Sequence, residues 1–189
     1  LDYQQKKKLL LSCISASDKF GNLYYENQYL TIYKEELEED VPFFMAELHY
    51  LQKTDSREVE RIVERLVGTS AKCVDEKLRF EAKVNAAMGL FYIGRDSRSF
   101  ELLTSMQSEY EERFKSDDKY AAMYAHALSL PSHDFDYNEK AVEASDTSAR
   151  MYHKQNNNYK YFVALVNKFD ALMGCGKIYD AFSTAMTVF

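Results

Sequence analysis

Two segments of the chain carry the same landmark residues at the same spacing. One segment contains Val84-Asn85, eight residues, Gly94-Arg95, four residues and Phe100, and the other contains Val166-Asn167, eight residues, Gly176-Lys177, four residues and Phe182. The two copies are 82 residues apart, and half of that offset is 41. At the midpoint His126 stands where the two copies have Asn, although the glycine has no counterpart at Phe135. A period of about 20–50 residues predicts a stack of similar helical units.

Breakers of secondary structure are scarce, since 189 residues include 6 Gly and 2 Pro. Apolar residues recur at helical spacing along most of the chain, and no segment alternates as a strand does. We therefore expect an all-α protein. Ten helices are predicted, over 2–18, 23–39, 42–53, 56–68, 73–93, 97–115, 117–129, 137–155, 159–174 and 177–188.

Glycine, proline and short polar residues place the helix ends. Gly21, Gly68 and the segment 174–176 are predicted to end helices, as left-handed caps do. We expect Asp96 to cap a helix start, and Pro131 to prevent extension of the helix before it. The stripe of Leu9, Cys13 and Ala16 is expected to face inward from the first helix. Leu23, Leu30, Tyr33 and Leu37 are expected to do so from the second.

The segment Gly176-Lys177-Ile178-Tyr179-Asp180-Ala181 resembles the Gly-Lys-Tyr-x-x-Ala turn of tetratricopeptide repeats. Ala87 stands where that superfamily keeps a small residue, and Ser99 matches Ala181. The resemblance implies a right-handed α-α superhelix of about five antiparallel helix pairs. We expect a single helical-repeat domain over 1–189, with divergent pairs in 1–72 and clearer repeats of about 41 residues in 73–189. Because the chain starts with Leu, we expect it to be part of a longer protein.

Charge and motifs exclude several classes of function. The net charge is −6 and no segment is basic overall, which disfavours binding to nucleic acid, including by pentatricopeptide-like RNA-binding repeats. Three scattered cysteines form no disulfide framework, so we expect a cytoplasmic protein. We find no membrane-spanning run, phosphate-binding loop or nucleophile elbow, and we expect neither a cofactor, a metal site nor enzyme activity.

Two sets of residues are candidate partner-binding positions. Asn85, His126 and Asn167 occupy corresponding points on the first helices of successive pairs, where side chains able to donate and accept could pair with a peptide backbone. The alternative is that they are ordinary polar positions on half-buried helices. Tyr25 and Tyr29, with Tyr24 and Tyr33, form an aromatic band that could be a binding hot spot or could pack between helices.

These observations favour a scaffold that binds a protein or peptide partner in the concave groove of a tetratricopeptide-like superhelix, because stacked helix pairs present an extended face. The alternative is a ligand- or peptide-sensing regulatory module of a larger multidomain protein. Either function is an expectation drawn from the fold class.

Overall fold

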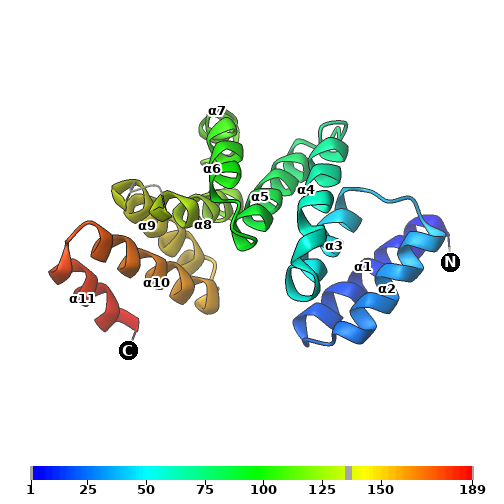
Figure 1. Ribbon diagram of the computed structural model, residues 1–189, viewed down its shortest axis with the longest axis horizontal. Coiled ribbons are helices and arrows are strands. Elements are labelled where there is room, and N and C mark those ends of the chain that lie inside the picture. The colour runs from blue at the N-terminus through cyan, green and yellow to red at the C-terminus, as the bar shows by residue number, and fades with distance from the viewer. Residues whose placement is uncertain (1, 135–137, 189) are drawn as a thin grey trace. The chain divides into compact units, whose positions relative to one another are not determined.

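The computed structural model describes residues 2–134 and 138–188, and within them the protein is entirely helical. These residues form eleven α-helices and one π-helical segment, and they contain no strand (Figure 1). The all-α class is thereby confirmed. The chain divides into two compact units at the boundary between Gly94 and Arg95.

The first unit contains five helices that pack in the order of the sequence. They are α1 (Tyr3–Lys19), α2 (Leu23–Glu36), α3 (Val41–Thr54), α4 (Ser56–Ser70) and α5 (Glu76–Tyr92). Each helix packs against the next, and α3 also packs against both α1 and α5. The odd-numbered helices therefore form a continuous layer, as alternate helices do in a stack of helix pairs.

The second unit contains the remaining elements. They are α6 (Asp96–Ser105), α7 (Gln107–Glu109), the π-helix η1 (Tyr110–Phe114), α8 (Asp118–Asp134), α9 (Asn138–Lys154), α10 (Asn158–Gly174) and α11 (Ile178–Val188). Helices α8 to α11 pack in sequence, and α8 also contacts α6, η1 and α10. The third expected helix pair, α5 with α6, is divided between the two units. Sequential packing is thus present in each unit, and the superhelix stays a prediction.

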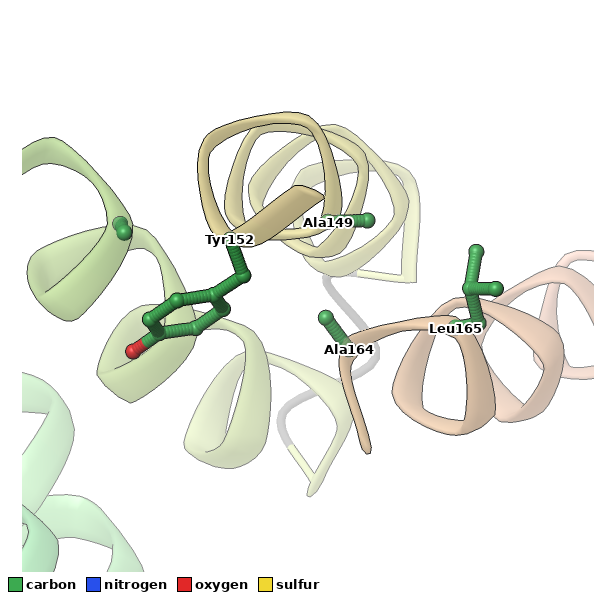
Figure 2. Close-up of a cluster of buried hydrophobic side chains, with 5 residues drawn as sticks. Ala149, Tyr152, Ala164 and Leu165 are labelled. Carbon is green, nitrogen blue, oxygen red and sulfur yellow. The ribbon is translucent and has the colours of Figure 1, made fainter. Parts of the chain in front are cut away.

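Three alanines allow the helices of the second unit to approach closely. Ala122 of α8, Ala149 of α9 and Ala164 of α10 belong to one buried cluster with Tyr152 and Leu165. In Figure 2, Ala164 points toward α9, the helix that carries Ala149 and Tyr152. Small side chains leave room for the large tyrosine ring, so the three helices can approach one another closely around it.

The residues that carry the repeat resemblance behave as expected. Ala87, Ser99 and Ala181 are all fully buried, so small side chains occupy these points between packed helices. Gly94 and Gly176 have φ angles of +73° and +70°, a left-handed conformation that favours glycine. Asn156, with φ of +55°, adopts the same left-handed conformation in the turn before α10.

Several predicted helix ends are wrong. Helix α8 continues through Pro131 to Asp134, because the proline ring is fully buried and its packing offsets the lost main-chain hydrogen bond. Helix α4 continues through Gly68 to Ser70. Asp96 is the first residue of α6 rather than its cap, and Arg95, at the cap position, provides no side-chain capping hydrogen bond.

The predicted helix 97–115 is interrupted at Met106, which is almost fully buried between α6 and α7. The π-helical turn that follows carries Tyr110 and Phe114, and both are buried. The ring of Tyr110 stacks on Tyr124 of α8, with 4.3 Å between centroids. A π-turn contains one more residue than an α-turn, which changes the direction of the side chains that follow. This turn places Tyr110 and Phe114 against α8, whereas an unbroken α-helix would direct them elsewhere.

In the first helix the buried stripe lies one residue away from the predicted one. Leu10, Ile14 and Ser17 are buried, whereas Leu9 is 51% exposed. Apolar residues fill both stripes of this helix, so periodicity alone could not choose between them. In α2, Leu30, Tyr33 and Leu37 are buried as predicted, but Leu23 is exposed and Glu26 takes the inward position.

Candidate functional site

Asn85 lies in a cavity of about 280 Å³ in the first unit, over the layer formed by α1, α3 and α5. The apolar side chains that line the cavity are Leu11, Ile14, Met45 and Ala46. The polar ones are Ser15, Asp18, Glu26, His49, Glu81 and Asn85. Four helices supply these residues, since α2 contributes Glu26, so the cavity depends on the stacking of successive helix pairs.

The Asn85 amide joins α5 to α3. Its Nδ2 donates to the main-chain oxygen of Glu81 at 2.8 Å, and its Oδ1 lies 3.3 Å from Nε2 of His49. Nδ2 also lies 3.7 Å from the sulfur of Met45. A carboxamide has two donor hydrogens and two acceptor lone pairs. Asn85 is therefore held in place and retains capacity to accept a further hydrogen bond.

Glu26 is the buried carboxylate of this cavity. The residue has 0% exposure, and within the described part of the chain neither of its carboxylate oxygens has a hydrogen-bond partner. The nearest cation is Lys53, whose Nζ lies 3.5 Å from Oε2. Burial raises the pKa of the Glu26 carboxyl, and the positive charge of Lys53 offsets part of that rise.

Lys53 is shared between two acids. Its Nζ makes a close ion pair with Oδ1 of Asp18 at the end of α1, in addition to the longer one with Glu26. Burial alone would lower the pKa of Lys53, but the Asp18 hydrogen bond and the Glu26 charge raise it above its ordinary value. One ammonium group thus faces two carboxylates, and none of the residues that line the cavity is Lys or Arg. The cavity is consequently acidic.

His126 and Asn167 lie in the second unit, on α8 and α10. Nδ2 of Asn167 lies 3.4 Å from the hydroxyl oxygen of Ser129, also on α8. The His126 ring meets Tyr152 edge to face, with 6.1 Å between centroids, and its buried Nδ1 has no hydrogen-bond partner among the described residues. Burial lowers the pKa of His126 to about 4, and the charge of Lys160 adds to this effect. At neutral pH the imidazole is therefore uncharged.

Tyr25 and Tyr29 stack on one another on α2, with 6.4 Å between ring centroids. Tyr25 is 49% exposed and Tyr24 is 68% exposed, so the start of this helix presents aromatic surface. Tyr33, from the same predicted band, is instead fully buried and stacks on Phe43. The band therefore divides into an exposed part and a core part.

A larger cavity of about 350 Å³ lies beside η1 in the second unit, and it contains none of the predicted site residues. Three of its charged side chains already take part in ion pairs: Lys115 pairs with Glu111 at 2.6 Å, and Arg150 lies 3.4 Å from Asp146. We therefore take the acidic cavity of the first unit as the candidate site.

Sequence reasoning found Asn85 but missed Glu26 and His49. Glu26 had a usable signal, because it stands four residues before Leu30 on the stripe that continues to Tyr33 and Leu37. A carboxylate on a buried stripe is unusual. His49 had no such signal, since its contact with Asn85 joins two helices 36 residues apart.

Comparison of the chain with protein-family models, with curated proteins and with solved structures finds no match. Across residues 2–134 and 138–188 no helix has the length and apolar character needed to cross a membrane. The same residues bring together no group of three or more His, Cys, Asp or Glu that could hold a metal ion. The segment His133-Asp134-Phe135-Asp136, whose residue types are compatible with metal binding, lies outside the described side chains.

Proposed function

We propose that this chain is a helical-repeat interaction module that binds an extended segment of a protein partner over α1, α3 and α5 of the first unit. The observation that supports this most directly is the cavity that crosses all three helices and contains the Asn85 amide. Alternate helices of stacked pairs form the recognition face in repeat proteins of this architecture, and the tetratricopeptide-like superhelix is part of the proposal.

The chemistry of Asn85 suits a peptide backbone. A main-chain N–H of the partner would donate to Oδ1, and a main-chain carbonyl would accept from the Nδ2 hydrogen that now faces Met45. The hydrogen bond to the Glu81 main chain fixes the rotamer before binding, so little side-chain entropy is lost. This role requires no chemical step, and we propose that the module acts without catalysis.

The proposal can be tested by selecting binders from a random peptide display library on the purified chain. Affinities of the selected peptides are then measured for the parent and for Asn85→Ala. Losing two hydrogen bonds of about 1 kcal/mol each would raise Kd by roughly 30-fold. Asn27→Ala is the matched control, because Asn27 is exposed on α2 and does not line the cavity.

Asn167→Ala provides a separate test of the second unit. If selected peptides lose affinity with Asn167→Ala and not with Asn85→Ala, recognition belongs to α8 and α10 and the proposed face is wrong. Peptides that bind the parent and Asn85→Ala equally well would also refute the proposal.

A further inference from the structure

Helix α11 is apolar on its outer side as well as on its inner side. Among the described elements it packs against α10 alone, beside which it lies in Figure 1. On the other side Ile178, Phe182 and Met186 recur at i, i+4 and i+8, and each is more than half exposed. Tyr179 adjoins this stripe and is 93% exposed, while Asp180 is the one charged residue of the helix. A helix that is apolar all round is normally buried all round, so the outer side of α11 indicates a further contact.

The exposed apolar surface continues from α11 onto α10. Phe162 and Val166 lie one turn apart on a single stripe of α10, and both are exposed. Phe169 follows on the same stripe, and its ring meets that of Phe182 edge to face, with 6.5 Å between centroids. The stripes of the two helices therefore join into one surface, which we call the α10–α11 face. Its exposed members are Phe162, Val166, Ile178, Tyr179, Phe182 and Met186.

The α10–α11 face lacks a contact that other helix pairs of the chain receive. Val166 is the counterpart of Val84 in the repeat, yet Val84 is 0% exposed and Val166 is 49% exposed. The preceding pair of the second unit, α8 with α9, is covered by α10, which packs against both helices. No element in the described part of the chain covers α10 and α11 in that way. Stacked helix pairs bury a continuous core and end in a polar face, so an apolar face at this point is expected to be an interface.

The area of this face is close to that of a protein–protein interface. A fully exposed large side chain presents about 200 Å², so the six exposed members together present on the order of 700 Å². The largest apolar patch on a typical monomer is about 300–600 Å², and each partner of a stable complex buries about 800 Å². None of the six residues is charged, so two copies of the face can meet without opposing like charges.

We propose that the α10–α11 face binds the same face of a second copy of this chain, in a dimer with two-fold symmetry. In such an interface both copies present the same residues, so the surface must be complementary to itself, and an apolar face meets this requirement. Phe182 is the expected anchor, because its ring lies where the two stripes join and remains exposed. The dimer belongs to the second unit and does not depend on the peptide-binding face proposed for the first.

Sedimentation equilibrium of the whole chain tests the proposal. Between about 1 and about 200 µM, the average mass is expected to rise from 22.0 kDa toward twice that value and to stop there. Phe182→Asp should raise the Kd of the dimer at least about tenfold, because each copy would bury a carboxylate in an apolar interface. Tyr179→Asp should have the same effect, and its exposed position leaves the fold intact, which circular dichroism verifies.

Tyr24→Asp is the matched control for Tyr179→Asp. Tyr24 is the second residue of α2, Tyr179 is the second residue of α11, and both side chains are exposed. The two substitutions therefore place a new carboxylate at the same point of a helix, with the same effect on the helix dipole. Tyr24→Asp should leave the Kd of the dimer within about twofold.

Three results would overturn the proposal. The first is a chain that stays monomeric at about 200 µM, in which case a helix of a different protein becomes the candidate occupant of the face. The second is a mass that keeps rising beyond two chains, because head-to-tail contacts do not close. The third is a dimer that both substitutions in α11 leave intact, or that Tyr24→Asp dissociates instead.

Discussion

His126 is expected to make the folding stability of the second unit depend on pH. Its Nδ1 is buried without a hydrogen-bond partner in the described residues, its ring lies against Tyr152, and the Lys160 ammonium stands over the same tyrosine at 5.3 Å. A proton on this imidazole would place a second positive charge in the same half-buried region. The folded protein therefore resists protonation, and the pKa of His126 falls from 6.5 to about 4.

The size of the effect follows from that difference. Below pH 6.5 the unfolded chain binds a proton that the folded chain does not, so stability falls as the pH falls toward 4. The difference between a pKa of 6.5 in the unfolded chain and about 4 in the folded one corresponds to about 3 kcal/mol if the whole window is crossed. By pH 5 the loss is about 2 kcal/mol, a large part of the 5–15 kcal/mol typical of a domain.

Urea denaturation between pH 7.5 and pH 4.5 measures this loss, with His126→Asn as the test variant. Asn is the residue at the equivalent position of the two clear repeats, and it does not titrate in this range. Carboxylates also titrate here, so the quantity of interest is the difference between parent and variant. That difference should change by about 2 kcal/mol between pH 7.5 and pH 5.

His153→Asn is the control, because His153 is exposed on α9. A parent and a His126→Asn variant with parallel stability curves would show that His126 is not buried as the structure places it. A His153→Asn variant that abolished the pH dependence would refute the assignment to His126.

Four further outcomes follow from single residues and can be checked by denaturant unfolding. Gly89→Ala should destabilise the protein by about 1 kcal/mol, because the new Cβ would lie 3.0 Å from the buried Leu48, whereas Gly68→Ala meets open space and should stabilise it by about 0.5–1 kcal/mol. Gly176→Ala should cost about 1–2 kcal/mol at its φ of +70°. Glu26→Gln should lose no stability at pH 7: the raised pKa means that the folded parent loses stability as the pH rises above 4.5, and the variant lacks that loss.

Local chemistry made much of the fold predictable. The helical class and the helix ends at Gly21 and Gly176 depend on short-range sterics. The start of α3 at Val41, one residue from the predicted start, depends on local capping. The side chain of Asp40 accepts a hydrogen bond from Phe43 N, as a helix cap does. Such features are determined by residues that lie within one helical turn of each other in the sequence.

Features that depend on tertiary packing were not predictable in this way. Pro131 remains inside α8 because its ring is buried, and the π-turn forms where Tyr110 can stack on Tyr124. In each case the burial of a ring stabilises a backbone conformation that the local sequence disfavours. That burial depends on side chains of neighbouring helices, which a local sequence pattern does not report.

The chemistry of the candidate site also depends on tertiary packing and was only partly predictable. Asn85, His126 and Asn167 are equivalent in the repeat, yet Asn85 faces His49 in an acidic cavity, Asn167 lies near Ser129, and His126 meets a tyrosine. Equivalent positions share a backbone setting, while neighbours on other helices decide what each side chain can bind. Of the three, Asn85 adjoins a buried carboxylate that lacks a hydrogen-bond partner in the described residues. A common repeat scaffold can therefore present different chemistry at each copy, since the carboxylate in the cavity beside Asn85 comes from Glu26 on α2, a helix outside the repeated pattern.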